Sequence, residues 1–205
     1  MSTPDVAVVE TGVANLASVL AAWRRLGIAA RRVLDPDEVR RADRVELPGV
    51  GAFGAAMDRL RSTGLDEALA GRVREGRPTL AICVGLQVLC DASEESPGIA
   101  GLGLVPGTVR RFPDRVRVPQ FGWNRVEAPP GGPLESGWAY YANSYRLADP
   151  PPGWGAAITD HGGPFVAALW RGDVLACQFH PELSGAWGLA MLSRWMRGGL
   201  AGGAP

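Results

Sequence analysis

The chain contains no lysine, because all 21 of its basic residues are arginine. This absence excludes a P-loop lysine on a nucleotide phosphate, a lysine Schiff base and a lysine general base. Histidine is almost as scarce, since only His161 and His180 occur in 205 residues. A metal site built from several histidines is therefore excluded, and no metal or other cofactor is expected. A catalytic cysteine would have only two candidate histidine bases.

Net charge, long apolar runs and paired cysteines are also missing. The formal net charge is zero, so the sequence lacks the excess positive charge that is typical of proteins that bind nucleic acid. No apolar run approaches the ~20 residues that cross a bilayer, and no signal peptide opens the chain. The three cysteines lack the spacing of a disulfide framework. We therefore expect a cytoplasmic protein that binds neither nucleic acid nor a membrane.

What the sequence does contain is an alternation of strand and helix patterns up to Asp91. Strands are expected at 5–10, 28–34 and 43–47 and before Cys83, and helices at 15–26, 52–75 and 84–89. This alternation predicts a parallel sheet with helices on both faces.

After Asp91 the composition changes, and glycine, proline and short β-prone runs predominate. Strands are expected at 104–112, 115–119, 124–128, 138–147, 156–159, 165–170 and 174–179, with a last helix capped by Ser184. We predict a single α/β domain over residues 1–198, with a central mostly parallel sheet, flanking helices and an antiparallel extension. Residues 199–205 are expected to form a flexible tail.

The stretch 78–87 (PTLAICVGLQ) is the first candidate functional element. An apolar strand runs directly into a helix, with Cys83 at the junction and the small residues Ala81 and Gly85 on either side. This is the pattern of a nucleophile elbow with cysteine in place of serine. The helix N-terminus favours the reactive thiolate. A buried structural cysteine fits this stretch equally well when it is considered alone.

The second candidate is the run 178–182 (QFHPE), which follows the last expected strand. His180 and Glu182 supply the base and the orienting carboxylate that a cysteine nucleophile needs. Taken separately, each residue also has an ordinary structural interpretation: His180 as a histidine at the end of a strand, and Glu182 as an exposed carboxylate at the start of a helix. With only two histidines in the chain, a His-x-Glu pair together with an elbow cysteine favours the catalytic interpretation.

Two further stretches suit a substrate site. In 47–54 (LPGVGAFG), glycines free the backbone so that N–H groups, with the Val84 N–H, can form an oxyanion hole. The same residues match G-x-G-x-x-G, but they follow the third expected strand and a proline, so the dinucleotide interpretation is rejected. The alternating run 140–145 (YYANSY) suits either a substrate-binding strand edge or an ordinary half-buried strand.

Taken together, these stretches resemble the class I (triad) glutamine amidotransferases and, more narrowly, the glutaminase subunits of imidazole glycerol phosphate synthase. The resemblance runs from residue 12 to the last helix. Its most specific pieces are LPGVGAF at 47–53, MDRLRSTGL at 57–65, ICVGLQVL at 82–89, FGWN at 121–124 and QFHPE at 178–182. It implies a flavodoxin-like class I amidotransferase fold.

The resemblance also implies a mechanism and a partner. Cys83 attacks the side-chain amide of L-glutamine, and His180, oriented by Glu182, transfers the protons. The Val84 N–H and the strand Gly49, Val50 and Gly51 hold the oxyanion, while Gln87, Ser144 and Tyr145 bind glutamine. Ammonia passes to a (β/α)8-barrel cyclase subunit in a heterodimer, which converts PRFAR to imidazole glycerol phosphate and AICAR in histidine biosynthesis.

Several residues depart from the family pattern. The family has Asp-Tyr at Glu10-Thr11, an apolar residue at Glu46, Gly at Ala81, His at Gln120 and Asn143, and Lys at Leu183. In the family this lysine lies at the cyclase interface. The changes at Gln120, Asn143 and Leu183 motivate one alternative, a paralogue that feeds ammonia to a different synthase. A non-catalytic binding subunit that kept the fold is a further alternative.

Overall fold

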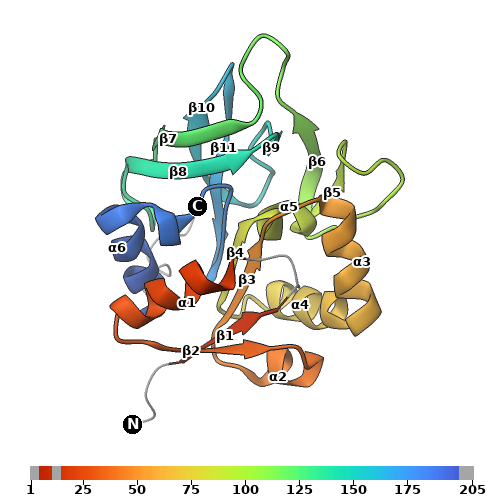
Figure 1. Cartoon of the computed structure of the whole chain (residues 1–205), viewed down its shortest axis with the longest axis vertical. Helices are drawn as coiled ribbons and strands as arrows, with labels where there is room; N and C mark the ends of the chain where they lie inside the picture. Colours follow the sequence, from red (N-terminus) through yellow and green to blue (C-terminus); the bar gives the residue numbers. More distant parts are fainter. Residues whose placement is uncertain (1–4, 11–14, 199–205) are drawn as a thin grey trace.

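The computed structural model describes residues 5–10 and 15–198, so the expected tail at 199–205 and Thr11 lie outside it. Its centre is a seven-stranded sheet in the order β10-β11-β12-β4-β3-β1-β2 (Figure 1). The parallel strands are β1 (Asp5–Val9), β2 (Ala29–Val33), β3 (Val45–Gly49), β4 (Thr79–Cys83) and β12 (Val174–Cys177). The strands β10 (Gly155–Asp160) and β11 (Pro164–Arg171) extend the sheet, and β11 is antiparallel to both of its neighbours. The predicted mostly parallel sheet with an antiparallel extension is confirmed.

Helices cover both faces of this sheet (Figure 1). One face carries α1 (Leu16–Arg25) and α6 (Gly185–Met196), which meet through Trp23 and Trp195 with their ring centroids 6.0 Å apart. The other carries α3 (Phe53–Thr63), α4 (Leu65–Arg74) and α5 (Val84–Leu89), with α2 (Pro36–Arg41) packed on α4. Within residues 5–10 and 15–198, no helix has both the length and the apolar character needed to cross a membrane.

Two small sheets complete the fold. One contains β5 (Cys90–Ser93), β6 (Val105–Arg111) and β9 (Tyr145–Leu147), and the other is the hairpin of β7 (Gln120–Val126) and β8 (Gly137–Asn143). Figure 1 shows β7 and β8 lying beyond the end of the sheet towards which β3 and β4 point. The carboxyl ends of the central strands, where ligands bind in such folds, therefore face these small sheets.

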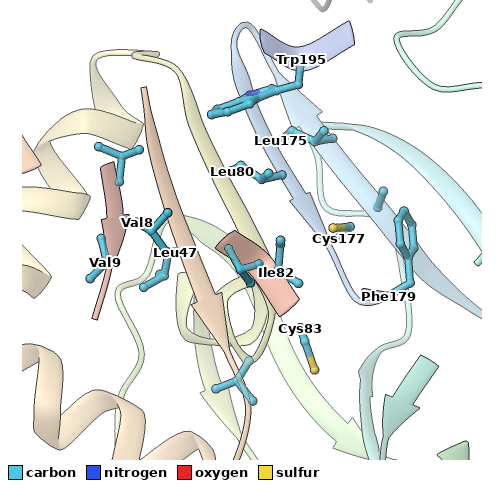
Figure 2. Close-up of a cluster of buried hydrophobic side chains, with 14 of the residues drawn as sticks. Val8, Val9, Leu47, Leu80, Ile82, Cys83, Leu175, Cys177, Phe179 and Trp195 are labelled. Atoms are coloured by element: carbon cyan, nitrogen blue, oxygen red, sulfur yellow. The ribbon is translucent and has the colours of Figure 1, made fainter. Parts of the chain in front are cut away.

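The central strands are buried along their whole length. Every residue of β3 and β4 is buried, as expected for parallel strands covered on both faces. Figure 2 shows the buried side chains of Leu47, Leu80, Ile82 and Leu175 on the central strands, with the Cys83 sulfur pointing away at the end of β4. This packing fixes the backbone that carries the cysteine.

Two expectations about the first half of the chain are wrong. The single helix expected over 52–75 is two helices, because Gly64 adopts φ +70° and ends α3 in the left-handed conformation. The helix α2 was also missed. Asp35 caps it by accepting a hydrogen bond of 2.8 Å from the Asp37 N–H, and Pro36 occupies its first turn, so these residues begin a helix there.

Other expectations fail in the second half. The segment 115–119 forms no strand; it follows Pro113 and ends at Pro119, and proline cannot donate a hydrogen bond to a ladder. The segment 138–147 is split at Ser144 into β8 and β9, which belong to different sheets. The strand β5 was not expected at all, since its four residues, CDAS, show neither an apolar run nor β-branched residues.

Candidate active site

Cys83 occupies a strained turn between β4 and α5. Its backbone has φ +55° and ψ −111°, and it is the one non-glycine residue with positive φ among residues 5–10 and 15–198. Such strain persists only where the surrounding packing holds it, and it is concentrated at functional sites. Gly85 makes the turn possible, since a Cβ there would lie 2.3 Å from the Leu47 carbonyl oxygen. The strand-to-helix elbow thus exists as the sequence predicts.

His180 and Glu182 follow β12, the strand next to β4. The His180 Nδ1 lies 2.9 Å from the Glu182 Oε1, and both side chains are almost fully buried. The backbone of His180 is held as well, because its N–H donates to the Tyr140 carbonyl over 2.9 Å. The Ser184 hydroxyl donates to the His180 carbonyl over 2.6 Å and accepts from the Tyr140 N–H. Ser184 therefore makes no capping bond to α6, contrary to expectation.

The pKa of His180 is shifted far from its ordinary value. Burial alone would lower this pKa, but hydrogen bonding and charge interactions with Cys83 and Glu182 outweigh burial and raise it to about 10. The raised pKa favours the protonated form of the imidazole beside the Glu182 carboxylate. That arrangement suits a thiolate–imidazolium pair.

The other two cysteines lie outside this arrangement. Cys90 and Cys177 are completely buried, and burial is the main reason that both thiol pKa values are raised, for Cys90 to about 12. Buried thiols of this kind are unreactive.

The glycine-rich strand lies beside the cysteine. Gly49 is the register partner of Cys83 across the β3–β4 ladder. A Cβ at Gly49 would come within 2.6 Å of the Gly85 nitrogen, so this glycine packs behind the elbow. Val50, Gly51 and Val84 lie in front of it and line a cavity together with Cys83. Gly51 has φ +90°, which glycine adopts without strain.

This cavity, of about 210 Å³, brings the expected site residues together. Its walls include Cys83, His180, Val50, Gly51, Val84, Gln87, Glu95, Asn143, Ser144 and Tyr145. The segments come from three sheets and lie far apart in sequence. All three residues expected to bind glutamine, Gln87, Ser144 and Tyr145, are on the wall. Glu182 and Gly49 stand behind it.

Glu95 was not expected in the site. It lies just after β5, and one oxygen of its carboxylate accepts a 2.7 Å hydrogen bond from the Phe53 N–H at the start of α3. It brings a negative charge to the cavity wall. Its sequence surroundings carry no signal, because its position depends on how the segment after β5 folds over α3.

The residues that depart from the family pattern lie in several environments. Gln120 and Asn143 face each other across the β7–β8 ladder, and both are buried. Leu183 is exposed, whereas Glu46 is buried in β3 and accepts a hydrogen bond from the Trp23 indole. Ala81 is buried in β4, and Glu10 forms an exposed pair with Arg32.

An exposed aromatic face lies on the hairpin of β7 and β8. In the ladder, Trp123 stands opposite Tyr140 and Trp138 opposite Arg125, so alternate residues share one side. Phe121 is 70% exposed, and Trp123 and Trp138 are each 55% exposed. Phe121 and Trp123 both pack edge-on against Tyr140. Exposed aromatic groups of this extent are typical of binding surfaces.

Known proteins show the same fold and related sequences. The family model of the CobB/CobQ-like glutamine amidotransferase domain matches residues 20–130. The chain is 43% identical over 197 residues to the imidazole glycerol phosphate synthase subunit HisH of Symbiobacterium thermophilum, covering 94% of this chain and 93% of that one. It is 40% identical over 205 residues to the chloroplastic imidazole glycerol phosphate synthase hisHF of Arabidopsis thaliana, covering 95% of this chain and 35% of that protein. A crystal structure of a glutamine amidotransferase superposes with a TM-score of 0.76 at 22% identity, covering 94% of this chain and 98% of that one.

Proposed function

Because this chain belongs to the HisH family, the glutamine amidotransferase subunits of imidazole glycerol phosphate synthase, we propose that Cys83, His180 and Glu182 hydrolyse L-glutamine to glutamate and ammonia. The observation that carries this proposal is the strained elbow cysteine, which shares a cavity with His180 of a buried His–Glu pair.

The reaction takes two steps. The Cys83 thiolate attacks the side-chain carbonyl carbon of glutamine, and His180 gives its proton to the nitrogen as ammonia leaves. Water, deprotonated by His180, then attacks the glutamyl thioester, and glutamate leaves as the thiol is restored. Glu182 stabilises the imidazolium and holds its ring orientation. The Val84 N–H and backbone donors of the strand Gly49 to Gly51 stabilise the oxyanion.

The cavity has groups that suit the rest of the substrate. Glutamine carries an α-ammonium, and Glu95 supplies a carboxylate on the wall. Gln87, Ser144 and Tyr145 line the same space and offer amide and backbone groups to the α-carboxylate and the side chain. No metal or other cofactor takes part in this scheme.

The proposed partner is a (β/α)8-barrel cyclase subunit, which takes the ammonia within a cytoplasmic heterodimer. The aromatic face on β7 and β8 is the proposed docking surface, because the Tyr140 carbonyl on this hairpin accepts a hydrogen bond from the His180 N–H. The fused Arabidopsis relative, of which this chain matches only 35%, supports a close association between the two activities. Leu183 offers an apolar contact where the family has lysine, so we expect no acid to face it on the partner.

The test is glutamate release from L-glutamine by the complex with the cyclase. Cys83→Ala should abolish release, and Glu182→Gln should lower kcat by about 100-fold or more, because the imidazolium loses its carboxylate. Cys90→Ala is the matched control and should keep activity. A glutamine-analogue electrophile should label Cys83 in the wild type.

Complementation separates the alternatives. The chain should restore growth without histidine in a strain that lacks its own glutaminase subunit. Failure to do so with folded, glutaminase-active protein would favour a different acceptor enzyme. Absence of both labelling and glutamate release would favour a non-catalytic subunit.

A further inference from the structure

A series of hydrogen bonds between buried side-chain amides ends at the sulfur of Cys83, the proposed nucleophile. The Gln178 Nε2 donates to the Cys83 Sγ over 3.6 Å. The Gln178 Oε1 accepts from the Gln87 Nε2 over 3.0 Å, and the same Gln87 nitrogen donates to the Tyr145 carbonyl over 3.2 Å. Gln178 is completely buried, and Gln87 and Cys83 are nearly so. The proposed mechanism gives Gln178 no part.

The orientation of these amides is set by a backbone group. The Tyr145 carbonyl can only accept, so Gln87 must turn its NH₂ group towards it. With that nitrogen also next to Gln178, the Gln178 side chain must present its oxygen to Gln87 and its own NH₂ to the sulfur. Turning either amide over would place two donors or two acceptors against each other in a buried space. The assignment of nitrogen and oxygen therefore follows from the connections of the network.

This orientation matters because Gln178 carries the same functional group as the proposed substrate. With its nitrogen towards Cys83, it offers an N–H donor to the thiolate. With its oxygen there, it would place a partial negative charge against the sulfur. A donor hydrogen bond to the charged form of a group favours that form, and the effect is stronger where water is excluded.

We propose that Gln178 is a positioning residue, which donates to the Cys83 thiolate and is held in the donating orientation by Gln87 and the Tyr145 carbonyl. The inference rests on the proposed role of Cys83 as the nucleophile. It also changes the role expected for Gln87. Both of its N–H groups are used within the protein, so Gln87 has only its oxygen left for glutamine and acts on the reaction through Gln178.

The experiment is the pH dependence of Cys83 alkylation by iodoacetamide in the folded chain, with Cys83→Ala giving the background. Gln178→Met removes the donor at similar volume and should move the midpoint of the rate profile up by about one pH unit, a tenfold loss of thiolate at low pH. Gln178→Glu keeps an oxygen for Gln87 but puts a carboxylate beside the sulfur, and should move the midpoint further. Gln120→Met is the matched control, because it replaces a buried glutamine that makes no hydrogen bond to Cys83, and should leave the midpoint unchanged.

A second variant guards against misfolding. Gln87→Met leaves Gln178 in place but frees its oxygen, and should move the midpoint in the same direction by a smaller amount, with the folded state checked by circular dichroism. Midpoints for Gln178→Met and Gln87→Met that match the wild type would overturn the inference, even if glutamine is hydrolysed. Shifted midpoints in a chain whose complex with the cyclase releases no glutamate would support the inference and refute the proposed function.

Discussion

The carboxyl group of Glu46 should make the stability of this protein fall as pH rises. Glu46 lies in β3 and is 1% exposed, with one hydrogen bond from the Trp23 indole. Burial raises its pKa from 4.5 to about 8, the Trp23 hydrogen bond opposes this shift, and the charge of Glu182 adds to it. Between these two values the folded state keeps a proton that the unfolded chain has lost. The free energy of unfolding therefore decreases with pH in this window.

The size of the effect follows from the shift. Each pH unit inside the window costs about 1.4 kcal/mol, so two units, from pH 5 to pH 7, cost roughly 3 kcal/mol. The variant Glu46→Gln has nothing to ionise and keeps an acceptor for Trp23. It should match the wild type near pH 4.5, exceed it by about 3 kcal/mol at pH 7, and gain little more above pH 8.

Urea unfolding at a series of pH values between 4.5 and 9 measures this difference. His180, whose pKa is also raised, contributes to both proteins and cancels in the comparison. Glu67→Gln removes the same charge at an exposed position of α4 and controls for net charge. In Glu46→Leu the Trp23 N–H loses its partner, which costs about 1–3 kcal/mol, so this variant should gain less. A difference between wild type and Glu46→Gln that stays constant with pH would refute the reasoning.

Two substitutions test the packing of the scaffold. Gly85→Ala should lower glutaminase activity several-fold or more and lower Tm, because its Cβ would lie 2.3 Å from the Leu47 carbonyl oxygen. Gly71→Ala in α4, where nothing lies within 4 Å of the added Cβ, should instead raise the free energy of unfolding by about 0.5–1 kcal/mol. Equal effects of the two substitutions would contradict this account. Arg72→Met should lower the free energy of unfolding by about 3 kcal/mol or more, since the buried guanidinium donates to four backbone carbonyls; a loss under ~1 kcal/mol would show that water replaces these bonds.

The fold was predictable where the signal is local. Alternating strand and helix patterns located the central strands, and Asn15 and Gly27 marked the ends of α1 as expected. The errors arose where one residue decides between two structures. Gly64 was included in a continuous helical pattern, although its left-handed conformation separates α3 from α4. The division at Ser144 between two sheets depends on tertiary pairing, which no local pattern shows.

The site was predictable to the same extent. The elbow and the His-x-Glu pair are short motifs, so their residues could be located, and the structure brings them to neighbouring strand ends. Glu95 and Gln178 could not be assigned a place. Glu95 contacts a residue 42 positions away and Gln178 contacts Cys83 over 95 positions, and sequence spacing alone says nothing of such contacts.

The hairpin that displays the aromatic face also supports the backbone of His180, the proposed base. The Tyr140 carbonyl accepts the His180 N–H, and the Ser184 hydroxyl joins the Tyr140 N–H to the His180 carbonyl. A molecule that binds Trp123 and Tyr140 thus contacts the hairpin whose strand β8 holds the His180 backbone. If a ligand of the aromatic face binds more tightly to one position of β8 than to another, linkage requires that it favour the corresponding position of His180 by the same free energy. The hairpin therefore joins the exposed aromatic face to the backbone of His180.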